Sequence, residues 1–221
     1  MTELKDNFHR LQGFENLYVV QFKKLWCVFL RLSDNSLCIY SPPSGLKGED
    51  IKEIQKLGDV SVLCAPNHYH HRGLAEHVNL FPNAKLVCST YAKPRLENQT
   101  GFQFENLNQL TKKLPETVTV LEPEGLKTGE IWLEIKDKDS TLWIVCDAFS
   151  SSPSKMDIFY GEPSMLKTFP NYGVGDRAVY KTWVVKQLSN HPPDVIVPCH
   201  GPPARQENLA QTLKNIVEIS F

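Results

Sequence analysis

The sequence has 221 residues, a formal net charge of −1, and acidic and basic residues scattered through both halves. This balance excludes a strongly basic surface for nucleic acid or an anionic membrane, and it favours a small-molecule substrate as the partner. No apolar run approaches the roughly 20 residues that cross a bilayer, so no membrane-spanning segment is expected.

The first part of the chain predicts strands followed by alternating helices and strands. From Asn16 to Tyr40, aromatic, β-branched and aliphatic residues are interrupted at Lys23-Lys24 and at Ser33-Asp34-Asn35-Ser36. This pattern predicts three antiparallel strands, the last two joined by a hairpin turn. The apolar spacing then predicts, in order, a helix over Glu49–Leu57, a short buried strand over Val60–Cys64, a helix over Leu74–Phe81 and a strand over Lys85–Ser89.

The second part of the chain repeats the alternation. Strands are expected at Thr117–Leu121, Ile131–Ile135 and Thr141–Cys146, and a long loop runs from Ser150 to Asp176. A helix from Arg177, a strand over Val195–Val197 and a helix over Leu209–Val217 complete the chain. Strands and covering helices in both halves predict an α/β (α+β) fold, a four-layer αββα sandwich of two mixed sheets with helices outside. We expect a single domain over residues 1–221.

Polar residues capable of binding metal follow three of the predicted strands. His68, His70 and His71 come after the strand that ends at Cys64, Asp147 follows Cys146, and His200 comes after Val197. Loops at strand ends commonly carry functional sites, and imidazole and carboxylate groups suit zinc and iron. The sequence therefore predicts a metal site made of His68, His70, His71, Asp147 and His200.

The histidine segment, Pro66-Asn67-His68-Tyr69-His70-His71-Arg72-Gly73, resembles a motif of the metallo-β-lactamase superfamily. That motif is His-x-His-x-Asp-His, followed two residues later by glycine. In this register His68 matches the second histidine and His71 the last, whereas His70 replaces the aspartate and Pro66 the first histidine. A competing register takes His68 and His70 as the opening pair, but it places Arg72 and Gly73 at ligand positions and is less favoured.

Two later segments resemble the same superfamily. Asp147 resembles its aspartate at a strand end, and Cys199-His200-Gly201 resembles its Gly-His-Gly turn. The superfamily's middle histidine is missing from Pro123–Gly129, where Glu124 is a possible substitute. The resemblance thus implies the αββα fold and one ion per chain, zinc or iron, because too few ligands remain for two.

The predicted ligand set suggests a reaction. Imidazoles and one carboxylate around a divalent ion leave net positive charge, which lowers the pKa of bound water toward about 7. We therefore predict a hydrolase acting on a small ester, thioester or phosphoester-like substrate, with Asp147 as the catalytic residue that binds the ion or orients the water. Two alternatives stay open: a degenerate, non-catalytic binding protein on this fold, and a redox or oxygen-reactive iron protein.

Other conspicuous residues are interpreted as structural. His77 lies on the apolar side of its predicted helix and is expected to pack there rather than bind metal. The six cysteines are spread singly, which is typical of buried thiols in a reducing compartment, and Cys199 is interpreted as tolerated beside His200. The N-terminus lacks a basic and apolar secretory signal, so a cytoplasmic location is expected.

Overall fold

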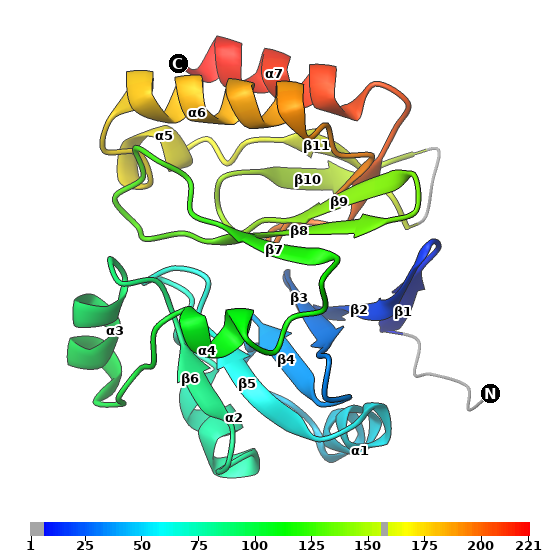
Figure 1. Ribbon diagram of the computed structural model, residues 1–221, viewed down its shortest axis with the longest axis vertical. Coiled ribbons are helices and arrows are strands. Elements are labelled where there is room, and N and C mark those ends of the chain that lie inside the picture. Colours follow the sequence, from blue (N-terminus) through cyan, green and yellow to red (C-terminus); the bar gives the residue numbers. More distant parts are fainter. Residues whose placement is uncertain (1–6, 156–158) are drawn as a thin grey trace. The chain divides into compact units, whose positions relative to one another are not determined.

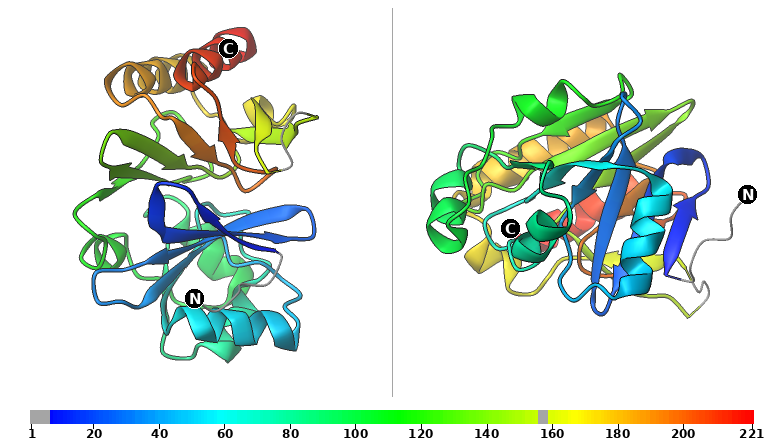
Figure 2. Two further views of the ribbon diagram at one scale, coloured as in Figure 1. Left: turned by 90° about the vertical axis from the view of Figure 1, so that its right-hand side faces the viewer. Right: turned by 90° about the horizontal axis from the view of Figure 1, so that it is seen from below.

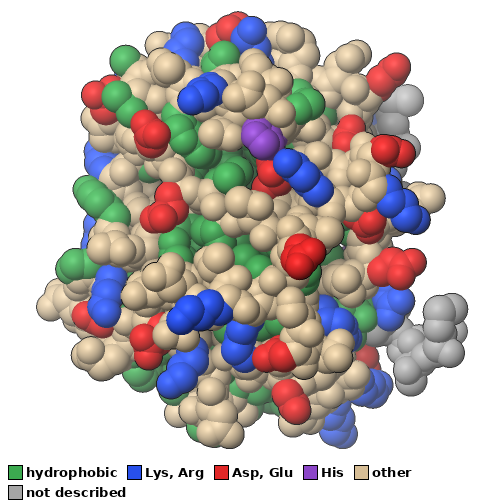
Figure 3. All heavy atoms as spheres, viewed as in Figure 1, with side chains coloured by type: hydrophobic (Ala, Val, Ile, Leu, Met, Phe, Trp, Pro, Cys, Tyr) green, Lys and Arg blue, Asp and Glu red, His purple; other side chains and the backbone are tan. Residues whose placement is uncertain are grey.

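The computed structural model describes residues 7–155 and 159–221, which form two compact units divided between Glu116 and Thr117 (Figure 1). Each unit is a mixed sheet with helices packed on it. Among the described residues, no helix is long and apolar enough to span a membrane. Acidic and basic side chains are interspersed on the face seen in Figure 3. The single domain expected over residues 1–221 stays a prediction.

The first unit contains a six-stranded sheet whose strand order follows the chain. Its strands are β1 (Phe8–Leu11), β2 (Phe14–Phe22), β3 (Leu25–Arg31), β4 (Leu37–Tyr40), β5 (Val60–Cys64) and β6 (Lys85–Val87). The pairs from β1 to β4 are antiparallel, and β5 and β6 then add in parallel. Because β4 and β5 are parallel, the loops that follow them leave the sheet at the same edge.

Helices cover the sheet of the first unit and close its core. They are α1 (Gly48–Leu57), α2 (Leu74–Leu80), α3 (Lys93–Thr100) and α4 (Asn108–Thr111). α1 and α2 lie on one face of the sheet (Figures 1 and 2). Phe29, Ile39 and Leu63 of the strands belong to the same buried cluster as Ile54 of α1 and Leu74 of α2.

The second unit contains a five-stranded sheet in the order β13-β12-β9-β8-β7 and a separate two-stranded ribbon. The strands of the sheet are β7 (Val118–Leu121), β8 (Trp132–Asp137), β9 (Ser140–Ile144), β12 (Val195–Val197) and β13 (Ala204–Arg205), and those of the ribbon are β10 (Ser150–Pro153) and β11 (Gly161–Ser164). β9 and β12 are parallel neighbours, with Ile144 opposite Val197. The segments that follow these two strands are therefore adjacent.

Three helices lie in the described part of the second unit: α5 (Phe169–Tyr172), α6 (Arg177–Asn190) and α7 (Leu209–Ser220). α6 and α7 run side by side on one face of the sheet (Figure 2, left). The Asp176 side chain caps α6 by accepting a hydrogen bond from the Val179 amide at 3.0 Å. Trp132, Trp143 and Leu213 are buried in the core between sheet and helices.

The predicted fold class is confirmed, with an α/β chain containing two large mixed sheets. Most predicted elements lie within a few residues of their expected bounds, and the β5 strand agrees at both ends. The prediction omitted β1, the β10–β11 ribbon and β13. β10 is Ser-Ser-Ser-Pro, so it lacks the apolar alternation that identifies a strand.

Candidate metal centre

The loop after β5, which carries the three histidines, is fixed by short-range contacts. The Asn67 side-chain oxygen accepts hydrogen bonds from the amides of Tyr69, at 2.8 Å, and His70, at 3.2 Å. Such a turn satisfies backbone donors that a strand would otherwise pair. At the end of the loop, a Cβ on Gly73 would overlap the backbone of Pro42 and Pro43, so only glycine fits there.

His68 lies beside a permanent cation. Its Nε2 atom is 3.1 Å from Nη1 of Arg95, whose guanidinium also lies 4.7 Å from the centre of the Tyr69 ring. Because a guanidinium only donates hydrogen bonds, Nε2 of His68 is the acceptor. A metal ion at this nitrogen would require Arg95 to move. The assignment of His68 as a ligand therefore stays a prediction. The Tyr69 ring is packed between neighbours, because Arg95 is stacked on it and the His68 ring lies close to it.

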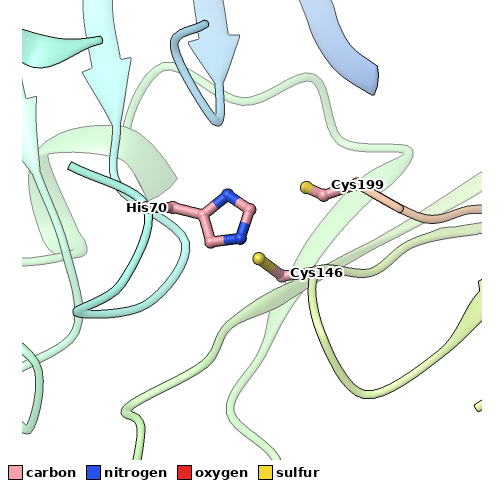
Figure 4. Close-up of side chains that lie close together, drawn as sticks. All are labelled: His70, Cys146 and Cys199. Carbon is pink, nitrogen blue, oxygen red and sulfur yellow. The ribbon is translucent and has the colours of Figure 1, made fainter. Parts of the chain in front are cut away.

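His70 and His71 are each oriented through one ring nitrogen. Nδ1 of His70 is 2.7 Å from Oγ of Ser41, the residue that follows β4. Nδ1 of His71 is 3.2 Å from the carbonyl oxygen of His68. A carbonyl only accepts, so the neutral His71 ring carries its proton on Nδ1 and its lone pair on Nε2. Figure 4 shows the His70 ring extending from this loop. Fixing one ring nitrogen so that the other can bind a cation is the usual arrangement of metal-binding histidines.

Ser41 combines burial with a left-handed backbone, which provides a test of its role. Its φ is 60° and it is 4% exposed. Ser41→Ala and Ser41→Gly both remove the hydroxyl from His70, but only glycine adopts this φ without strain. We expect the alanine variant to be the less stable by about 1 kcal/mol in chemical denaturation. We also expect both to bind metal about 10-fold more weakly. Unchanged metal affinity in both variants would exclude an orienting role for the hydroxyl.

In the second unit the structure brings Asp147 and His200 together. Nε2 of His200 lies 2.9 Å from Oδ1 of Asp147. This contact follows from the pairing of β9 with β12, because each residue comes three positions after the paired residues Ile144 and Val197. Asp147 is 2% exposed, and the Tyr172 hydroxyl also hydrogen bonds to it. Burial raises the pKa of Tyr172, and the negative charge of Asp147 adds to this shift, so the phenol stays protonated and donates.

Glu130, just before β8, holds the segment that carries Asp147. Its two carboxylate oxygens accept hydrogen bonds from the amides of Cys146 (3.2 Å), Asp147 (3.0 Å) and Ala148 (3.2 Å), and from Nε1 of Trp132 (2.8 Å). Burial raises the pKa of Glu130, as does the charge of Asp147, whereas the N–H donors of Trp132, Asp147 and Ala148 lower it. Glu130 therefore acts as a positioning residue for the loop after β9.

Gly201, after His200, is required by both space and backbone conformation. Its φ is 109°, and a Cβ there would overlap the carbonyl oxygen of Ser151. We expect Gly201→Ala to lower the free energy of unfolding by about 2–4 kcal/mol, since strained backbone and steric overlap both contribute. Gly13 has a φ of 87° with no atom near its missing Cβ, so Gly13→Ala should cost only the conformational part, about 1 kcal/mol. Equal unfolding midpoints for the two variants would contradict this account.

The donor sets of the two units suit a divalent metal ion. The first unit supplies imidazoles on one loop, and the second supplies an imidazole and a buried carboxylate in contact. In the second unit, ligand atoms of Glu130, Cys146 and Asp147 also lie within 4.8 Å of one another. Imidazole, carboxylate and thiolate are the ligands that proteins offer to zinc and iron. The chemistry of these residues therefore fits the metal that the sequence predicted.

The structure also identifies residues that sequence reasoning missed or misplaced. Glu124, considered as a substitute ligand, is exposed, whereas the buried carboxylate of that region is Glu130. Tyr172 was assigned to the long loop from Ser150 to Asp176, and in the structure its hydroxyl hydrogen bonds to Asp147. His77 packs as expected: it is fully buried, and its Nε2 donates to the Pro43 carbonyl at 2.9 Å. The apolar run after Glu130 was the one sequence signal for its burial.

Comparison with known proteins identifies the fold. No protein-family model and no curated protein matches the sequence. Among solved structures, the chain is similar to the DIM-1 metallo-β-lactamase, with a TM-score of 0.61, 12% identity, and coverage of 99% of this chain and 96% of that one. It is also similar to a fragment of a diflavin flavoprotein from Nostoc sp. PCC 7120, with a TM-score of 0.63, 13% identity, and 96% of each chain covered.

A third similar structure is the Flv1 flavodiiron core from Synechocystis sp. PCC6803, with a TM-score of 0.60 and 11% identity. The match covers 91% of this chain and 58% of that one, so the chain spans little more than half of that protein's length. The chain therefore has the metallo-β-lactamase fold, as the motif resemblance implied. At 10–14% identity, this likeness concerns the fold alone.

Proposed function

We propose that this chain is a metal-dependent hydrolase that uses water on a small ester, thioester or phosphoester-like substrate. Its ion, one zinc or iron per chain, is held by ligands among the five predicted residues, His68, His70, His71, Asp147 and His200. The observation that carries the proposal is the 2.9 Å contact between His200 and Asp147. The two residues are 53 positions apart in sequence, both follow strand ends, and both are ligands that the motif resemblance implies.

The names of the similar structures support a metal-based function. One is a metallo-β-lactamase and another is a flavodiiron core, so metal appears in both names. A bound divalent ion supplies Lewis acidity, which lowers the pKa of a water molecule toward about 7.

The residues of this chain fix the direction of the Asp147 carboxylate and allow it to accept a proton. Asp147 is held between the His200 imidazole and the Tyr172 hydroxyl, so its carboxylate is fixed in direction. A buried carboxylate in this position can bind a cation or accept a proton from water. His200 is about one third exposed, so its ring is accessible to a ligand from solvent. Glu130 fixes the backbone at Asp147 by accepting a hydrogen bond from its amide.

The proposal is tested by hydrolysis of chromogenic ester, thioester and phosphodiester substrates by the protein as purified. We expect activity toward at least one class, its loss on treatment with a chelator, and its recovery with zinc or ferrous iron. Asp147→Asn retains the shape of the side chain and should lower kcat by at least about 100-fold, the scale of general acid–base catalysis. Activity that survives both chelation and Asp147→Asn would refute the proposal.

One observation favours a second candidate, a non-catalytic binding protein on the same fold. Arg95 donates to Nε2 of His68, so a nitrogen of the predicted metal-binding loop already has a cationic partner. Pro66 also replaces a histidine of the superfamily motif. Protein that binds no metal and hydrolyses none of the substrates would favour this candidate. Bound iron with visible absorption would instead favour a redox or oxygen-reactive iron protein.

A further inference from the structure

Arg95, on α3, is an exposed arginine that contacts an imidazole and an aromatic ring. Its Nη1 atom lies 3.1 Å from Nε2 of His68, and its guanidinium carbon lies 4.7 Å from the centre of the Tyr69 ring. In the described part of the chain, no carboxylate forms an ion pair with Arg95, and no acceptor other than His68 bonds to it. A guanidinium carries five N–H groups, so most of its donors remain available to a ligand.

The two contacts hold the guanidinium in one orientation beside the histidine loop. His68 is only 6% exposed, so its ring provides a fixed acceptor for Arg95. Tyr69 is 37% exposed, so its ring and the guanidinium stacked on it are both accessible from solvent. Arg95 therefore presents a preorganised positive charge, and little conformational freedom is lost when an anion binds to it.

The position of Arg95 in α3 is electrostatically unfavourable without an anion. The first turn of α3 contains Lys93 and Arg95 and no acidic residue, although the N-terminus of a helix already carries partial positive charge. The charge of Lys93 is offset by Glu97, whose carboxylate oxygen lies 3.7 Å from Nζ of the lysine. Arg95 has no such partner among the residues that the structure describes. A bound anion would supply the missing negative charge.

Packing alone explains a similar pair in the same unit, Arg10 and Tyr18, but it does not explain Arg95. Arg10 is also exposed, lies 5.2 Å from the centre of the Tyr18 ring and donates to the Tyr18 hydroxyl. Both contacts are with one residue, which is directly opposite Arg10 in the pairing of β1 with β2. Arg95 instead bonds to a histidine of the predicted metal-binding loop, which is where a substrate of the proposed hydrolase would bind.

We infer that Arg95 binds an anionic group of the substrate and that this substrate is a phosphoester. The inference rests on the proposed hydrolase and narrows its three substrate classes to one. The reacting group of a phosphodiester carries negative charge on its nonbridging oxygens, whereas the carbonyl groups of esters and thioesters are neutral.

The guanidinium of Arg95 suits this role. Because Nη1 contacts His68, the edge formed by Nε and Nη2 remains to donate two parallel hydrogen bonds to a pair of phosphate oxygens. Its positive charge also stabilises the charge of the phosphoryl group during reaction. Arg95 stays protonated throughout, and no bond to it forms or breaks. Since Nε2 of His68 is engaged by Arg95, the ion is then held by ligands among the other four predicted residues.

Two substrates with the same leaving group test the inference. Bis(p-nitrophenyl) phosphate is anionic, p-nitrophenyl acetate is neutral, and both release p-nitrophenol. Arg95→Met should lower kcat/KM for the phosphodiester at least about 10-fold, because it removes charge-assisted hydrogen bonds, and should leave that for the acetate unchanged. Arg95→Lys keeps the charge but not the planar fork, so it should fall between. Arg10→Met removes another exposed, tyrosine-stacked arginine and should affect neither substrate.

Phosphate binding by the unmodified chain gives a second measurement, which does not depend on activity. In proton–nitrogen correlation spectra, the Arg95 Nε–H signal is identified by its absence from the Arg95→Met protein. This signal should shift on titration with inorganic phosphate and should not shift with sodium chloride at equal ionic strength. The Arg10 signal should not respond to either salt.

The outcomes separate this inference from the proposed function. Phosphodiester hydrolysis that is equally fast in Arg95→Met, or hydrolysis of the acetate alone, overturns the inference and leaves the proposed hydrolase intact. An Arg95 signal that does not respond to phosphate also overturns the inference. Phosphate binding at Arg95 without hydrolysis of any substrate overturns the hydrolase and its substrate, and leaves Arg95 as an anion-binding residue of a non-catalytic protein.

Discussion

Replacing His200 with alanine is expected to remove most of the bound metal. His200 contacts the buried carboxylate of Asp147, so its loss deletes one ligand and releases the partner of another. Loss of outer partners of metal ligands typically weakens binding 10–100-fold, so loss of a direct ligand should exceed about 100-fold. Metal content is measured by inductively coupled plasma mass spectrometry after gel filtration in chelator-treated buffer. His71→Ala should behave in the same way, because its ring is oriented through Nδ1 with Nε2 left to bind.

Two histidines serve as controls for this experiment. His191→Ala removes a partly exposed imidazole at the end of α6, in the same unit as His200, and should leave the metal content unchanged. His77→Ala removes the buried imidazole that donates to Pro43, and it should lower stability without releasing metal. Equal metal retention in the His71, His200 and His77 variants would show that the assigned register of the histidine motif is wrong.

Substitution of Glu130 is expected to produce the largest loss of stability. Its carboxylate accepts hydrogen bonds from the Trp132 indole and from the amides of Cys146, Asp147 and Ala148. Glu130→Ala leaves all four donors buried without an acceptor, so the free energy of unfolding should fall by at least about 4 kcal/mol. Glu130→Gln keeps one oxygen and places an NH2 group against an N–H donor, so we expect a loss of about 2–3 kcal/mol.

Chemical denaturation of both Glu130 variants beside Glu122→Gln tests this expectation. Glu122 is exposed and lies on the same segment of the second unit, so its substitution should change stability by less than about 0.5 kcal/mol. A Glu130→Gln protein as stable as Glu122→Gln would show that the four hydrogen bonds do not hold the loop after β9. In that case the positioning role assigned to Glu130 would be abandoned.

Sequence periodicity was sufficient to predict the main elements of the fold. Leu25–Arg31 and Val60–Cys64 are mostly apolar runs bounded by turn residues, and both are strands in the structure. The Leu209, Leu213 and Val217 spacing identified the last helix, whose buried residues are those three. The prediction missed elements that form by pairing with a neighbouring strand and that have no apolar pattern of their own. β13 has two residues and exists only because Ala204 and Arg205 pair with β12.

The candidate site could be predicted only in part. The histidines of the loop after β5 were predicted from a motif, and Asp147 was predicted from its position at the end of a strand. Both signals are local in sequence. Glu130 and Tyr172 act through contacts across 17 and 25 residues, which no short pattern encodes. The contact between Cys146 and Cys199 likewise depends on the parallel register of β9 and β12.

Arg95 is a further example of information that only the structure contains. It lies on α3, 27 residues after His68. Its guanidinium changes the environment of His68 from that of a free imidazole to that of a hydrogen-bond acceptor beside a cation.

Metal analysis of the unmodified chain tests the central claim most directly. The protein is purified without added metal, and its zinc and iron are quantified per chain by inductively coupled plasma mass spectrometry. We expect about one equivalent of a single metal, zinc or iron, since a ligand set of imidazoles and one carboxylate binds one ion. Less than about a tenth of an equivalent, unchanged after incubation with zinc and removal of the excess, would contradict the proposed metal centre.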